Sequence, residues 1–359
     1  MTTYIIRRLL LFFPTLLGIT IVVFAVMALS PGGVGASLLT REGGMDPRVR
    51  KEVEAYYNKR YGLDKPLPVQ YLRWLNEVSP VGTKEAGTGF PQAWGFGFKM
   101  PDLGESLVRH RPVIDLMKES LPITLLLNFI SIPLVYLIAI VTGITAAKHR
   151  GKIADVGLGS VLLAMWSVPQ IWAGVLLIGF LGSNQYLKIF PVNGLHDVQS
   201  DGMTFLPHII HGAFERGWLL DSLWHLVLPV FCLSYVSFAF LSKLQRSSML
   251  ENIGLDYVRT ARSKGLGEKT VLYQHVFRNS LIPLITISAS ILPSLLSGAV
   301  IVESIFGING MGKLIVDGAL AHDRELVLSD ALVIGGLGLI SYLLADICYV
   351  IADPRVSYD

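Results

Sequence analysis

Two segments carry residues spaced like a nucleotide site or a metal site, and each lacks one essential member. Residues 307–314 read GINGMGKL, which has the glycine and lysine spacing of a phosphate-binding loop. Leu314 replaces the hydroxyl residue that would hold magnesium, and the segment follows an apolar run instead of a strand. His208, His211 and Glu215 would share one face of an outer interfacial helix, but a fourth zinc ligand is missing. We therefore expect neither nucleotide nor metal on this chain.

Catalytic constellations are also missing from the sequence. It contains no Gly-x-Ser-x-Gly elbow and no paired cysteine and histidine of the kind used by hydrolases. Both cysteines, Cys232 and Cys348, lie inside apolar runs, which argues against a disulfide framework or a thiolate metal site. The sequence predicts a protein that is not an enzyme.

The amino-acid composition indicates a membrane protein. Of 359 residues, 52% are hydrophobic and only 16% are charged, whereas soluble domains carry about 25% charged residues. The net charge of +3 is too small to suggest a nucleic-acid partner.

Six apolar runs are long enough to cross a bilayer, which needs roughly 20 helical residues. They are Leu9 to Leu29, Leu121 to Ala147, Val156 to Leu181, Leu226 to Ser242, Ser280 to Val302, and Ala331 to Ile351. We expect the first run to be a retained helix, because it exceeds the usual core of a signal peptide. The fold class expected is an all-α membrane protein, and the prolines in these runs favour kinks at unspecified positions.

The distribution of lysine and arginine orients the spans. Arg7 and Arg8 precede the first span, residues 148–152 contain three basic residues, and the connection after the fourth span with its helix ends contains seven. The third-to-fourth and fifth-to-sixth connections contain two each, and the segment after the first span is too long to be counted. Cytoplasmic connections are the basic ones, so both termini are expected in the cytoplasm.

This orientation divides the chain into a first transmembrane helix (1–30), an extracytoplasmic segment (31–120) and a transmembrane domain (121–355). In the outer segment we expect a helix from Asp46 to about Gly62 and another from Val69 to Val78. Residues 79–98 have no periodicity and are expected to form a loop. That loop either caps the outer mouth or docks a soluble partner.

The segment 243–280, between the fourth and fifth spans, has the most informative pattern. Asp256 can cap a short helix, and Gly265 can end that helix in the left-handed conformation. Tyr257, Ala261 and Lys264 fall along one face, while Arg259 and Arg262 supply charge. A second helix is expected to begin near Glu268 and to continue through Arg278 into the fifth span.

Here the chain resembles the integral membrane subunits of binding-protein-dependent ABC importers. Their cytoplasmic loop carries an alanine, a glycine four residues later and a Leu-Pro or Ile-Pro further on, matched here by Ala261, Gly265 and Ile282-Pro283. Residues 256–266, DYVRTARSKGL, resemble the oligopeptide and dipeptide permease branch. Segments 61–66, 246–250, 275–279, 302–306, 310–312 and 353–355 are also similar to that branch. Three segments outside the loop depart from its pattern: 79–98, 101–104 and 322–325.

The resemblance implies a multi-pass permease of the bacterial inner membrane that imports peptides or similar small solutes. It implies a homologous second permease, two ABC ATPase subunits that bind ATP and magnesium, and an extracytoplasmic substrate-binding protein. The residues implied to couple the permease to the ATPase are Asp256, Tyr257, Arg259, Ala261, Arg262, Lys264 and Gly265. The plain alternative for this loop is a basic segment held against anionic lipid.

Three ionisable residues in or near the spans, Glu303, Asp330 and Asp346, should face protein or water. Glu303, near the outer end of the fifth span, is our candidate for a pathway residue that receives the positive end of a peptide. Two other classes of function stay open from the residues alone: an ion-coupled secondary transporter and a membrane-anchored receptor or scaffold.

Overall fold

The computed structural model describes residues 2–29, 55, 65–83, 96–106, 108–210, 213–288, 299–321 and 323–352. The helix expected over 46–62 (apart from residue 55), the centre of the 79–98 segment, His211 and the motif 353–355 lie outside these residues. The chain divides into two compact units. Unit 1 comprises residues 1–119 and 314–339, and unit 2 comprises residues 120–313 and 340–359.

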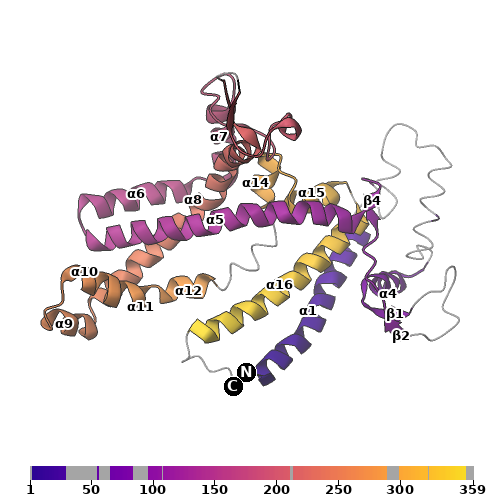
Figure 1. The fold of residues 1–359 in the computed structure, drawn as a ribbon. Coiled ribbons are helices and arrows are strands. Elements are labelled where there is room, and N and C mark those ends of the chain that lie inside the picture. The colour runs from indigo at the N-terminus through magenta and orange to yellow at the C-terminus, as the bar shows by residue number, and fades with distance from the viewer. Residues whose placement is uncertain are drawn as a thin grey trace. The chain divides into compact units, whose positions relative to one another are not determined.

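Long apolar helices dominate both units, as expected of an all-α membrane protein. The longest are α1 (Thr2–Leu29), α5 (Val113–Lys148), α8 (Gly217–Ile253) and α16 (Arg324–Ala352). Each contains an apolar stretch long enough to cross a membrane, so four candidate spans occur among the described residues (Figure 1). At 1.5 Å per residue, the 36 residues of α5 extend about 54 Å, well beyond the roughly 30 Å hydrocarbon core.

The third apolar run is broken at Val168 and Pro169, a position that the sequence analysis did not single out among the possible kinks. Helix α6 (Ile153–Ser167) ends before Pro169, and α7 (Gln170–Leu177) continues at 93° to it into the π turn η1 (Ile178–Gly182). Val168 adopts an extended conformation, as the residue before a proline usually does. The Tyr235 hydroxyl donates to the Val168 carbonyl at 2.6 Å, so α8 satisfies an acceptor that the break exposes.

The fifth apolar run is described only at its ends. Helix α12 (Ile282–Ser288) precedes residues 289–298, and α14 (Val300–Ile305) follows them. Helix α15 (Met311–Leu320) comes next. With the bent α6–α7 pair counted as one span, the described residues hold up to five candidate spans.

Unit 1 contains the described part of the outer segment. Helix α4 (Leu67–Val78) confirms the expected helix, and it packs on α1 through Tyr71, whose hydroxyl lies 2.9 Å from that of Thr20. The segment expected as a loop has ordered ends: β1 (Val81–Thr83) pairs antiparallel with β2 (Phe96–Phe98). A second short ladder joins β3 (Glu105–Ser106) to β4 (Arg111–Pro112).

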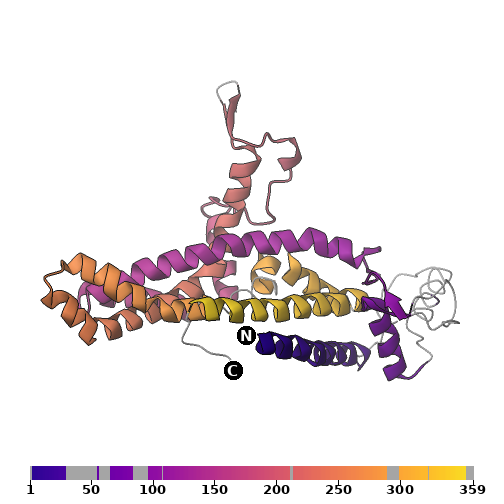
Figure 2. The same cartoon turned by 60° about the horizontal axis from the view of Figure 1, so that its bottom comes forward.

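Helix α8 forms the centre of unit 2. Its apolar stretch is 67% buried, against 28% for α5. Three hydrophobic clusters lie along it, including one built on Tyr235 and Phe238 near its middle and one on Met249 near its end. Figure 2 shows the short helices that follow, from α9 to α12, folding back at this end of α8.

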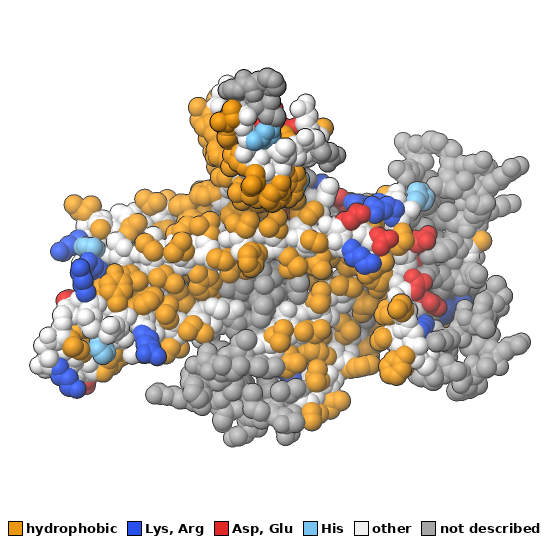
Figure 3. Space-filling view, in the orientation of Figure 1, with side chains coloured by type: hydrophobic (Ala, Val, Ile, Leu, Met, Phe, Trp, Pro, Cys, Tyr) orange, Lys and Arg blue, Asp and Glu red, His pale blue; other side chains and the backbone are white. Residues whose placement is uncertain are grey.

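Many of the basic residues of unit 2 lie together at one end. Basic side chains occupy the turn between α5 and α6 and the region of α9 to α11, while the flank of α5 and α6 is covered by hydrophobic side chains (Figure 3). This separation follows the lysine and arginine pattern from which the orientation was predicted.

Candidate functional site

The short helix α9 (Asp256–Ser263) begins one residue earlier than the sequence suggested. Leu255 is the N-cap residue, with φ −78° and ψ 153°, and Asp256 is the first helical residue without a side-chain capping bond. The expected Asp256 cap is therefore wrong, since the extended conformation falls on the preceding leucine. The exposed Asp256 carboxylate instead lies 3.4 Å from the Arg259 guanidinium, near the positive end of the helix dipole.

Gly265 ends α9 as expected. Its φ is +77°, and its N–H donates to the Arg262 carbonyl at 2.9 Å, while the Leu266 N–H donates to the Ala261 carbonyl at 3.4 Å. These two bonds form a Schellman motif, which requires a left-handed residue at this position. A Cβ atom added to Gly265 would meet no atom within 4 Å. Backbone conformation, and not space, is what favours glycine here.

The candidate coupling residues divide between two faces of α9. Ala261 is buried with Val258 against Val271 and Val276, and Tyr257 donates a 2.8 Å hydrogen bond to the Asn252 side chain. These inner residues anchor α9 on unit 2, so the small size of Ala261 permits close approach within the chain itself. The exposed residues are Asp256, Arg259, Arg262, Lys264 and Gly265.

A salt bridge closes the turn after α9. Arg262 donates to both carboxylate oxygens of Glu268, at 2.6 and 3.2 Å. The hydrogen bond from Arg262 lowers the pKa of Glu268, and the same bond raises the pKa of Arg262. Glu268 was absent from our sequence candidates. The pairing joins residues six apart across a turn, a spacing that a helical pattern does not single out.

The helix after this turn follows the expected course with one irregularity. Helix α10 (Glu268–Thr270) leads into the π helix η3 (Val271–Phe277), then into α11 (Arg278–Ser280) and α12. The η3 residues Val271 and Val276 hold the inner face of α9. A π helix displaces side chains relative to an α-helical register, so sequence periodicity alone would not locate these contacts.

Glu303 is fully buried in unit 2. Its carboxylate accepts hydrogen bonds from the Thr124 hydroxyl at 2.9 Å, the Ala299 N–H at 3.1 Å and the Lys313 N–H at 2.9 Å. The Gly-rich segment 307–313 thus wraps a carboxylate of its own chain. A Cβ atom at Gly310 would collide with this carboxylate, which explains that glycine. Contact of Glu303 with a transported solute stays a prediction.

The other residues singled out from sequence are placed as follows. His208 and Glu215 lie on the strands β5 (His208–Ile210) and β6 (Ala213–Glu215), with 3.3 Å between His208 Nε2 and Glu215 Oε2. The expected outer helix is therefore wrong, because these residues face each other across a hairpin. Asp330 is fully buried in α16, as are Arg324 and Glu325 in the first turn of that helix, and Asp346 is half-buried.

Two family models match the chain. Residues 139–358 match the model described as binding-protein-dependent transport system inner membrane component. Residues 1–128 match the model of the N-terminal part of such membrane components.

Curated relatives match over the full length. The oligopeptide transport system permease protein AppB of Bacillus subtilis is 35% identical, with all of both chains covered. The di/tripeptide transport system permease protein DppB of Pseudomonas aeruginosa is 33% identical over all of this chain and 99% of the relative. The inner membrane ABC transporter permease protein YejB of Escherichia coli O157:H7 is 29% identical, again with full coverage of both.

Proposed function

The chain belongs to the family of binding-protein-dependent transport system inner membrane components, and from this membership we propose that it is the permease subunit of an ABC importer that carries peptides across the inner membrane. Membership makes it a permease subunit and not itself an ATPase. The full-length similarity to relatives named for oligopeptide and di/tripeptide transport supports a peptide substrate.

We propose six membrane spans with both termini in the cytoplasm and a large extracytoplasmic segment at 31–120. The four long apolar helices and the bent α6–α7 pair support five of these spans. The remaining span, which is the fifth in chain order, would correspond to the apolar run from Ser280 to Val302. The basic residues gathered around α9 to α11 support the orientation.

The partners proposed are a homologous second permease, two ABC ATPase subunits and an extracytoplasmic substrate-binding protein. ATP and magnesium would bind to the ATPase subunits, and this chain would need no cofactor of its own. In unit 2, the backbone N–H of Lys313 binds the Glu303 carboxylate, which supports a structural role for the glycine-rich segment in place of phosphate binding.

The observation that carries the mechanism is the two-faced structure of α9. Its inner face, with Val258 and Ala261, is packed into the cluster shared by α8 and η3. Its outer face presents Asp256, Arg259 and Arg262. A force applied to the outer face would therefore reach α8 through packed side chains. We propose that the ATPase binds this face and that ATP hydrolysis moves α8 and α12, which alternates access to the pathway.

Affinity purification of the chain from its native membranes, followed by identification of co-purifying proteins, tests this function. We expect a second permease and ABC ATPases. A folded, monodisperse preparation without an ATPase would contradict the importer proposal. Peptide uptake that persists when the ATPase cannot hydrolyse ATP would instead indicate a secondary transporter.

A further inference from the structure

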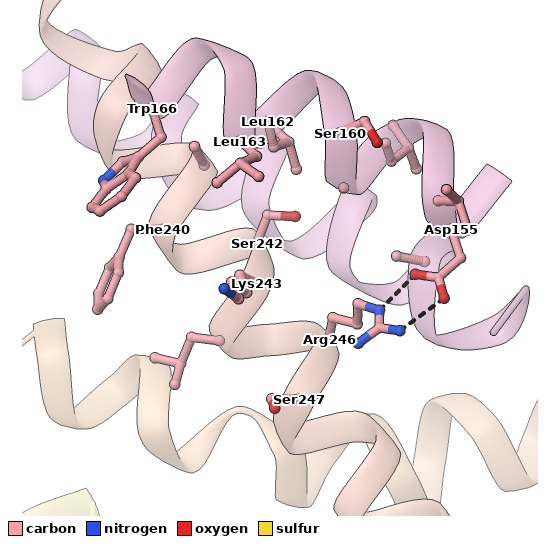
Figure 4. Close-up of a pocket in the computed structure, with 16 residues that line it drawn as sticks. Asp155, Ser160, Leu162, Leu163, Trp166, Phe240, Ser242, Lys243, Arg246 and Ser247 are labelled. Carbon is pink, nitrogen blue, oxygen red and sulfur yellow. Dashed lines mark hydrogen bonds and ion pairs between the residues drawn. The ribbon is translucent and has the colours of Figure 1, made fainter. Parts of the chain in front are cut away.

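A cavity of about 720 Å³ lies between α6 and α8 in unit 2, within the size range of small-molecule pockets. Its apolar wall is formed by Leu162, Leu163 and Trp166 of α6 and by Phe240 and Leu244 of α8. Trp166 and Phe240 lie together at one end of the cavity, and Asp155 and Arg246 lie at the other (Figure 4). The cavity is therefore amphipathic along its length.

The charge at the polar end is only partly balanced. Arg246 donates to both oxygens of Asp155, at 2.6 and 2.8 Å, and the Gly151 N–H donates to the same carboxylate at 2.9 Å. Asp155 and Arg246 thus neutralise each other. Lys243 also lines the cavity, and within the described part of the chain it has no ion pair or hydrogen bond. One positive charge remains.

Ser247 lies on the same face of α8 as Lys243, because residues four apart in a helix are neighbours. At this spacing, an ammonium group and a hydroxyl group can both donate hydrogen bonds to the same anionic group. The turn at the same end of α6 carries Arg150 and Lys152. Basic residues next to a membrane helix attract anionic lipid headgroups.

We propose that this cavity holds an anionic phospholipid of the leaflet that faces the basic turn. Lys243 and Ser247 would bind its phosphate, and the wall near Trp166 and Phe240 would take its acyl chain. An apolar helix of the second permease fits the cavity less well, since it would bury the Lys243 ammonium without a counter-charge. The proposal uses the membrane orientation given above, to assign the leaflet, and is independent of the transported solute.

Such a lipid would connect α6 to α8 close to the segment that carries α9. Only residues 254–255 separate the end of α8 from α9. Binding of the lipid would therefore stiffen the α6–α8 pair where motion from α9 enters the membrane.

The test uses the purified complex reconstituted in nanodiscs of phosphatidylcholine with a minor fraction of phosphatidylglycerol. Native mass spectrometry then measures which lipids stay bound after release. We expect selective retention of phosphatidylglycerol. Lys243→Gln should reduce this selectivity about fivefold, the effect of one basic residue at the membrane surface. Lys243→Arg, which keeps the charge, should retain most of it and shows that position 243 tolerates substitution.

Lys152→Gln is the matched control, because it removes an exposed charge from the turn outside the cavity lining. It should leave the selectivity nearly unchanged. Equal losses in Lys152→Gln and Lys243→Gln would overturn the proposal in favour of diffuse surface attraction. Unchanged selectivity in Lys243→Gln would also overturn it. So would efficient crosslinking of a Ser247→Cys variant to the second permease, since a protein helix would then occupy the cavity.

Discussion

At the scale of single residues, a comparison of Gly265 with Gly267 distinguishes a requirement for a particular backbone conformation from a lack of room for a side chain. An added Cβ would meet nothing within 4 Å at either position, but only Gly265 has a positive φ, +77°. Gly267 has φ −61° and ψ 144°, which any residue adopts. The two glycines flank the same turn, and they differ in the sign of φ, which is the property that the end of α9 requires.

We predict that Gly265→Val weakens coupling to the ATPase, whereas Gly267→Val does not. A β-branched residue in the left-handed conformation would cost the native end of α9 roughly 1–2 kcal/mol. Both variants should insert in the membrane. Substrate-stimulated ATPase activity of the reconstituted complex measures the difference, and equal activity in the two variants would refute the role of the left-handed turn.

At Glu303, two variants can distinguish the effect of the negative charge from the effect of the hydrogen bonds. Its carboxylate binds three donors, so Glu303→Gln would turn an amide NH₂ toward an N–H group and cost about 1–3 kcal/mol. Thr124→Val removes two bonds of the same network but keeps the negative charge.

If Glu303 also receives the positive end of a peptide, uptake by Glu303→Gln should fall further than uptake by Thr124→Val at equal membrane abundance. Radiolabelled peptide uptake, normalised to assembled complex, measures this. Normal uptake by an assembled Glu303→Gln variant would remove Glu303 from the pathway and leave it a purely structural role.

At the scale of elements, α9 and α10 are joined by the Arg262–Glu268 bridge as well as by the Gly265 turn. Because the pKa of Glu268 is lowered in the folded chain, the bridge stabilises this turn at every pH above the ordinary range of a glutamate. The contribution is lost as the pH falls through the lowered pKa. Both side chains are largely exposed, so the effect is small.

We predict that Glu268→Gln at neutral pH increases local opening of residues 256–267 about two- to fivefold, as expected for a surface ion pair. Acidification below the Glu268 pKa should do the same to the unmodified protein. Hydrogen exchange, corrected for intrinsic rates, reports the opening. Glu251→Gln, which changes an exposed carboxylate on α8, serves as control. Identical exchange in Glu268→Gln and Glu251→Gln would mean that the bridge contributes nothing.

At the scale of the whole molecule, the membrane topology depends on the α6–α7 bend. A pair of helices bent by 93° can cross the bilayer as a broken span or return to the side it entered. The basic turn at 148–152 favours a cytoplasmic location for the start of α6. The family architecture that we propose then requires the residues after α7 to lie outside.

We predict that Lys152→Cys and Val198→Cys lie on opposite sides of the membrane. Both positions are exposed, Val198 almost completely. With Cys232 and Cys348 replaced by alanine, an impermeant maleimide added to spheroplasts should label Val198→Cys at once and Lys152→Cys only after permeabilisation. Labelling of both from the same side would show a re-entrant pair and exclude the six-span topology.

Much of the element structure was predictable because it depends on local properties of the chain. The length of an apolar run indicates a span, and Gly265 after a short amphipathic stretch indicates the end of α9. The strand pairing of Val81–Thr83 with Phe96–Phe98 was not predictable, because each strand has only three residues and its partner lies beyond an intervening segment. The π helix η3 was missed for a related reason: its register breaks the 3.6-residue period on which helix patterns rest.

By itself, the sequence indicated a membrane permease subunit, in agreement with the family matches, and it predicted where the coupling segment lies, because hydropathy, charge distribution and motif spacing can be read along the chain. The tertiary structure decided what each residue faces. In the folded chain, Ala261 is packed in the interior and Arg262 binds Glu268. Thr124 and Glu303, which are 179 positions apart in the sequence, are joined by a hydrogen bond. The tertiary structure also aligned α6 with α8 so that Lys243 lines a cavity. Contacts between distant residues depend on how helices pack, and packing leaves no periodic signal in either partner alone.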